Sequence, residues 1–139
     1  MKLRFLPITT IGLFLCSLGL AMPSIALPLQ VGVYRVGSTY IQIAQKGNRL
    51  CFRGFSARGA TTASIYPDSE NPGFYKINGL TDLVISQQDP KTLLFGNLNS
   101  LSSYEADYEF PRDITDDLQR CLQSKKTFLE RVSGGRGGS

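Results

Sequence analysis

Residues able to carry out acid–base or metal chemistry are few in this sequence, and only one group of them is regularly spaced. Glu105, Asp107 and Glu109 alternate with apolar or small residues over 104–110, a pattern typical of a β-strand. Three carboxylates on one strand face could bind a hard cation such as Ca²⁺, or supply a carboxylate pair for glycoside hydrolysis. Neighbours on such a face stand about 7 Å apart, too far to share one ion without ligands from other strands. We therefore expect a solvated face that pairs with the arginines of earlier strands.

Other catalytic arrangements are disfavoured by the residues that the chain lacks. It contains no histidine, so a serine or cysteine nucleophile would be without its usual base. The glycines within 53–59 do not have the spacing of a loop that holds phosphate. We expect no catalytic residue, no metal ion and no cofactor, and hence a protein that is not an enzyme.

The first 26 residues have the pattern of a secretory signal peptide. Lys2 and Arg4 precede an uncharged run rich in leucine and isoleucine, and Ser24 and Ala26 stand at the small-residue positions before a cleavage site. We expect cleavage after Ala26 and a periplasmic or extracellular location. A membrane-spanning anchor is the alternative, although prolines and glycines interrupt the apolar run.

Two of the three cysteines, Cys51 and Cys121, lie beyond this leader. An exported chain meets an oxidising compartment, where a pair of cysteines usually forms a disulfide. We predict a Cys51–Cys121 disulfide that closes a loop of about 70 residues and contributes on the order of 4 kcal/mol to stability. Two buried free thiols or a metal site are the alternatives, and the metal site would lack its remaining ligands.

Basic residues gather in the first part of the chain that follows the leader. Residues 27–66 contain five basic residues and no acid, whereas residues 67–117 contain ten acids. Arg49, Arg53 and Arg58 are the best candidates for a binding face toward an anionic partner. The alternative is that basic and acidic strands lie side by side in one sheet and their charges pair.

Six tyrosines and no tryptophan make tyrosine the second candidate for ligand contact. A tyrosine offers an apolar ring with a polar tip, so these side chains could line a ligand groove. The alternative places the rings in the core of a barrel with the hydroxyl groups at its rim.

The elements that would position these residues are short and mostly strands. Hairpin 40–55 is the clearest, because alternating residues flank a Gly47-Asn48 turn, and Leu50 and Phe52 then face away from Cys51. Further strands are expected at 32–37, 60–66, 74–77, 80–87, 92–95 and 104–110, followed by a helix over 114–129 and a flexible glycine-rich tail over 132–139. This pattern predicts a single mainly β domain over 27–131: a small antiparallel β-barrel or sandwich of about eight short strands with one C-terminal α-helix.

Three stretches, GVYRVG (32–37), YIQIAQKGNRLCFRGFS (40–56) and GFYKING (73–79), resemble small exported proteins of cyanobacteria that carry no assigned function. The resemblance covers most of the chain after the leader and implies a compartment but no activity. The architecture is also similar to small exported lysozyme inhibitors, although their inhibitory-loop motif matches no stretch here.

These observations lead to an expected function of contact without catalysis. We expect a monomeric, exported binding protein of the cell envelope that contacts a protein or a cell-wall component. It would meet the membrane only during export and would have no nucleic-acid partner. The alternatives are a small lipocalin-like carrier of an apolar ligand, an inhibitor of a secreted enzyme, and a hydrolase built on the acidic residues of 104–110.

Overall fold

The computed structural model describes residues 27–133, which form nine β-strands and one α-helix. The expected signal peptide (1–26) and residues 134–139 of the expected tail lie outside the described residues. The strands are β1 (Gly32–Val36), β2 (Thr39–Lys46), β3 (Arg49–Ser56), β4 (Gly59–Pro67), β5 (Tyr75–Ile77), β6 (Leu80–Asp89), β7 (Thr92–Asn97), β8 (Ser100–Ala106) and β9 (Leu129–Ser133), and the helix is α2 (Asp116–Gln123).

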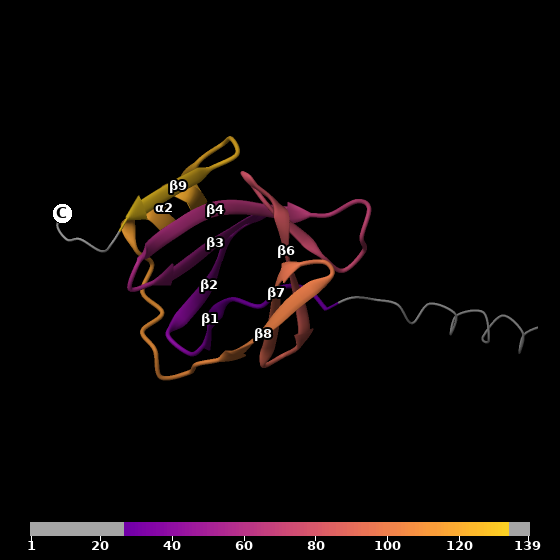
Figure 1. Cartoon of the computed structure of the whole chain (residues 1–139). Helices are drawn as coiled ribbons and strands as arrows, with labels where there is room; N and C mark the ends of the chain where they lie inside the picture. The colour runs from indigo at the N-terminus through magenta and orange to yellow at the C-terminus, as the bar shows by residue number, and fades with distance from the viewer. Residues whose placement is uncertain (1–26, 134–139) are drawn as a thin grey trace, which may run out of the picture.

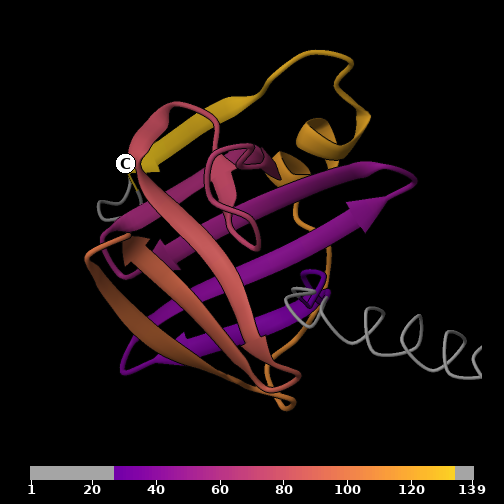
Figure 2. The same cartoon turned by 90° about the vertical axis from the view of Figure 1, so that its right-hand side faces the viewer.

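Strands β1 to β8 form a closed antiparallel barrel (Figures 1 and 2). The order around it is β3, β2, β1, β8, β7, β6, β5, β4, and β4 pairs again with β3 to close the circle. All but one of the connections within the barrel are two residues long, and Gly37 and Gly47 each have φ +61°, as tight hairpin turns require. The expected mainly β fold of about eight strands and one C-terminal helix is confirmed, and the β3–β4 pairing makes it a barrel.

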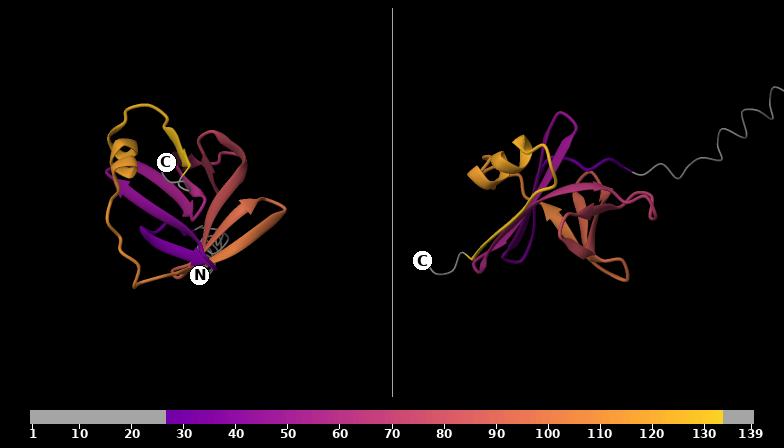
Figure 3. Two further views of the ribbon diagram at one scale, coloured as in Figure 1. Left: turned by 60° about the vertical axis from the view of Figure 1, so that its left-hand side comes forward. Right: turned by 90° about the horizontal axis from the view of Figure 1, so that it is seen from above.

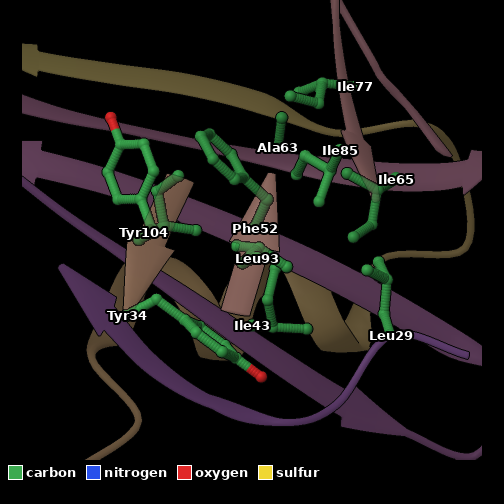
Figure 4. Packing of buried hydrophobic residues seen from close by; sticks show 11 residues of the cluster. Leu29, Tyr34, Ile43, Phe52, Ala63, Ile65, Ile77, Ile85, Leu93 and Tyr104 are labelled. Atoms are coloured by element: carbon green, nitrogen blue, oxygen red, sulfur yellow. The ribbon is translucent and has the colours of Figure 1, made fainter. Parts of the chain in front are cut away.

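Apolar side chains that alternate along the strands fill the barrel interior (Figure 4). In the central hairpin, Ile41, Ile43 and Phe52 point inward and are at most 2% exposed. The other members of this core are Leu29, Tyr34, Ala63, Ile65, Ile77, Ile85, Leu93 and Tyr104. Full burial of one large apolar side chain is worth about 1.5–3 kcal/mol, so this cluster is the main source of stability.

The segment that precedes β1 closes one end of the barrel. Leu29 is 7% exposed and belongs to the core. The Gln87 side chain accepts a hydrogen bond from the Gln30 backbone N–H (3.0 Å) and donates one to the Tyr34 hydroxyl (3.2 Å). That hydroxyl donates in turn to the Gln30 carbonyl (2.9 Å), so these three residues hydrogen-bond to one another at the closed end.

The C-terminal segment packs on the outside of the barrel, over β3 and β4 (Figures 1 and 3). Leu118 and Cys121 of α2 are fully buried against Ala44 and Cys51, which point outward from β2 and β3. Leu122 and Phe128 complete this second, smaller core. An isolated helix of eight residues is unstable in water, so this packing is what maintains α2.

The expected helix over 114–129 is wrong in its bounds. The helix covers only Asp116–Gln123 and ends at Ser124, whose backbone is extended. Leu129, which was expected on the apolar helix face, begins β9 instead and pairs with Ala63. The backbone of β4 provides the physical reason, because it offers hydrogen-bonding groups that β9 takes up. In the described part of the chain, no helix has the length and apolarity that crossing a membrane requires.

The expected strand over 104–110 is also displaced. Strand β8 runs from Ser100 to Ala106, so it begins in a segment that was expected to be a loop. The chain turns at Asp107, whose side chain accepts hydrogen bonds from the backbone N–H groups of Glu109 (3.1 Å) and Phe110 (3.2 Å). This side-chain cap competes with a continuing strand, as is common for aspartate.

The barrel wall is incomplete at one place. Strand β5 has three residues and pairs with only the last part of β4, so Gly59 to Ala63 of β4 pair with β9. Residues 81–83 of β6 have no partner in the register of either neighbouring strand. No pairing joins β9 to β6 among the described residues, and the two halves of the molecule diverge there (Figure 3, left).

Candidate ligand-binding site

A pocket of about 470 Å³ lies at this incomplete part of the wall. We call it the side pocket. Most of its lining is apolar or aromatic and includes Ile41, Phe52, Leu80, Leu83, Phe95 and Tyr104. Small-molecule sites occupy about 300–1,000 Å³ and have linings of this kind, so the side pocket has the size and character of such a site.

Three aromatic rings form the inner wall of the side pocket. Phe52 and Phe95 stack with ring centroids 5.6 Å apart, and Phe95 meets Tyr104 edge to face at 5.9 Å. Gly54 makes the position of the Phe52 ring possible, because a Cβ there would come within 2.8 Å of the ring carbon Cζ. The rings therefore pack against one another, and the absence of a side chain at Gly54 leaves room for the Phe52 ring.

The Tyr104 hydroxyl is the polar group of this wall. The residue is 6% exposed, and its hydroxyl has no hydrogen-bond partner within residues 27–133. Figure 4 shows the hydroxyls of Tyr104 and Tyr34 pointing in opposite directions, and only that of Tyr34 reaches the closed end. Burial raises the pKa of Tyr104, so the group keeps its proton and can donate a hydrogen bond.

The predicted disulfide is present and lies away from the side pocket, on the outer face of β3. Cys51 and Cys121 are bonded, with Cα atoms 6.3 Å apart, and both are fully buried. The bond joins the central hairpin to α2 across 70 residues of sequence. A disulfide of this kind is compatible with an oxidising compartment.

Asp117 of α2 is the polar centre of the same interface. Its carboxylate accepts hydrogen bonds from Arg53 Nε (2.8 Å), from the hydroxyls of Thr62 and Thr115, and from the Leu118 backbone N–H (3.0 Å). Burial acts to raise the pKa of this carboxyl, but the hydrogen bonds from Thr115, Thr62 and Arg53 outweigh it and lower the pKa to about 2. The group is thus ionised and fully engaged within the protein.

The three arginines of the predicted binding face have different surroundings. Arg53 forms an ion pair with Asp117, and its guanidinium lies 4.6 Å from the centre of the Phe55 ring. Arg49 donates hydrogen bonds to the carbonyl groups of Cys121 (3.0 Å) and Lys126. Only Arg58, in the β3–β4 turn, has an exposed side chain without such a contact in residues 27–133. Binding of a partner by this face stays a prediction.

The acidic residues expected on one strand face do not share a strand. Glu105 belongs to β8, whereas Asp107 and Glu109 follow it. Asp107 lies 3.9 Å from Arg35 of β1, which agrees with the expected pairing to an early arginine. Within residues 27–133, no three Asp, Glu, Cys or His side chains come together as a metal site would require.

Several residues of the site were not singled out from the sequence. Leu83 and Phe95 read as ordinary strand residues, and Arg131 lies between the expected helix over 114–129 and the expected tail over 132–139. In β9, Arg131 lies opposite Thr61 of β4, and both line the side pocket. No local pattern could have revealed this, because β9 forms only where β4 lacks a partner.

Comparison with known proteins identifies no relative of this chain: no protein-family model, curated protein or solved structure matches it. The resemblance to small exported cyanobacterial proteins therefore stays a prediction.

Proposed function

We propose that this is an exported, non-catalytic binding protein that holds a small, largely apolar molecule in the side pocket. The observation that carries this proposal is a mostly apolar pocket of about 470 Å³, lined by Tyr104, a residue 6% exposed whose hydroxyl has no partner in residues 27–133. A ligand with a hydrogen-bond acceptor could pair with that hydroxyl.

This proposal favours the carrier among the functions expected from the sequence. A protein partner on the arginine face has less support, because Arg49 and Arg53 already bind groups of the C-terminal segment. Export is supported by the leader-like pattern of residues 1–26 and by the Cys51–Cys121 disulfide.

Titration with a neutral fluorescent probe tests the proposal. N-phenyl-naphthylamine has an aromatic body of suitable size and becomes fluorescent in an apolar site, so we expect saturable binding to the protein. Thr61→Trp would fill the side pocket from β4, and it should weaken binding about tenfold or more, which corresponds to about 1.4 kcal/mol.

The control is Thr81→Trp, which adds the same ring at an exposed position that does not line the side pocket. Binding should survive in this variant. The proposal is wrong if the protein does not bind the probe, or if both variants bind it as the wild type does.

A further inference from the structure

The charges around the side pocket point to the class of molecule that it would hold. Among its lining residues, Arg131 is the only one with a charged side chain, and no acid lines it. Two acids of the C-terminal segment have other partners, since Glu130 binds Arg120 at 2.6 Å and Asp117 binds Arg53. The charged group that lines the side pocket is therefore a cation.

The alternation of β9 explains why Arg131 is on the pocket side. Glu130 faces α2, where it binds Arg120, so the residues on either side of it face the opposite way. Leu129 confirms this direction, because its side chain lies against Gly79 in the turn between β5 and β6. Arg131 is exposed and forms no ion pair with a residue of the described chain.

The side pocket thus has polar groups of different kinds in its wall and at its mouth. Tyr104 is a largely buried residue whose hydroxyl can donate one neutral hydrogen bond, whereas Arg131 is exposed and can donate two to an acidic group. The surface between them is formed by Phe52, Phe95, Leu80 and Leu83. A ligand that fits this order has an apolar body and one anionic end.

We propose that the side pocket selects an amphipathic organic anion, with an aromatic or aliphatic body against the rings and a carboxylate or sulfonate at Arg131. This inference rests on the proposed function and adds to it the charge of the ligand and the residue that recognises it.

A matched pair of probes separates the two proposals. Anilinonaphthalene sulfonate and N-phenyl-naphthylamine share one aromatic skeleton and differ in the sulfonate. We expect the wild-type protein to bind the sulfonate more tightly. Arg131→Gln should weaken sulfonate binding about fivefold, as for an ion pair at a partly exposed site, and weaken binding of the neutral probe much less.

Two further variants make the result specific. Arg58→Gln removes the same net charge from a residue that does not line the side pocket, and it should keep the preference for the sulfonate. Arg131→Lys keeps the positive charge, so this variant should retain part of the preference for the sulfonate. Equal binding of both probes by the wild type, or the same loss in both glutamine variants, would overturn the inference and leave the proposed function standing. If neither probe binds, both proposals are wrong.

Discussion

Asp117 illustrates how a single side chain can fasten one part of this protein to another. Its carboxylate lies at the start of α2 and accepts hydrogen bonds from β3 and β4 as well as from its own helix. Hydrogen bonds to a charged acceptor are worth about 1.5–3 kcal/mol when both groups are sheltered from water. Asp117 thus links the first turn of α2 to both strands.

The acid stability of the protein should depend on Asp117. Its pKa in the folded protein is about 2, below the ordinary value of 3.8, so its contribution is complete above about pH 4 and is lost as the pH falls through 2. We expect Asp117→Asn to reduce the free energy of unfolding at neutral pH by about 2 kcal/mol and to weaken its acid dependence between pH 4 and 2. Urea unfolding at several pH values measures both effects.

The control for this prediction is the neighbouring residue of the same helical turn. Asp116 is exposed, and Asp116→Asn should change the unfolding free energy by no more than about 0.5 kcal/mol. An equal loss in the two variants would mean that helix charge, and not the hydrogen bonds of Asp117, is responsible.

The two buried core tyrosines should respond differently to loss of the hydroxyl. Tyr34→Phe removes a group that bonds to both Gln30 and Gln87, and we expect a loss of about 1 kcal/mol. Tyr104→Phe removes a hydroxyl without a partner in residues 27–133, so thermal stability should stay the same or rise. Differential scanning calorimetry measures the stability of both variants. A larger loss of stability for Tyr104→Phe than for Tyr34→Phe would contradict the site as described.

At the scale of elements, the C-terminal segment depends on the barrel for its structure. Helix α2 is held by the disulfide and by Leu118, and β9 is held by the free edge of β4. The Arg120–Glu130 ion pair joins the helix to the strand, with Arg120 donating to both carboxylate oxygens. Because β9 also supplies Arg131, the disulfide on one side of β4 supports the pocket on the other.

Removal of the disulfide should therefore loosen α2 and β9 before the barrel. The chain-entropy relation for a loop of about 70 residues gives a loss of about 4 kcal/mol for Cys51→Ala with Cys121→Ala. We expect hydrogen exchange of the amides of α2 and β9 to accelerate most, and reduction of the wild type to have the same effect. Uniform acceleration across β2, β3 and β7 would show that the segment unfolds only with the whole domain.

At the scale of the whole molecule, the structure is a filled barrel with a pocket in its side. One end is closed by Leu29 and the Gln87 hydrogen bonds, and the interior is occupied by the core residues. The side pocket lies where a short β5 leaves the wall incomplete. Other pockets of the described residues have similar volumes, and the side pocket differs from them in its mostly apolar and aromatic lining.

Binding in this pocket should stabilise the entire domain, since its lining comes from strands all around the barrel. At a probe concentration 100 times its dissociation constant, mass action adds about 2.7 kcal/mol to the free energy of unfolding. Thermal unfolding with N-phenyl-naphthylamine should show the corresponding rise in the midpoint. Thr61→Trp should show no rise, and a similar rise in that variant would place the probe elsewhere.

The sequence alone determined the elements whose signals are local. The Gly47-Asn48 turn and the alternation around it specify the central hairpin, because turn geometry and strand period act within a few residues. Cysteine content and the expected export predicted the Cys51–Cys121 bond. Two-residue turns and alternating strands also made a small antiparallel fold predictable, though not the choice between barrel and sandwich.

Tertiary structure alone decided the features that depend on pairing and packing between segments far apart in the sequence. The β3–β4 pairing closes the barrel, and the short β5 leaves the edge of β4 on which 129–133 forms a strand, where the sequence predicted the end of a helix and the start of a tail. Pairing of β9 with β4 brings Arg131 beside Thr61, and tertiary packing sets Tyr104 edge to face against Phe95. Backbone hydrogen bonds between distant strands outweigh weak local preferences, which is why the candidate site could not be read from the chain in order.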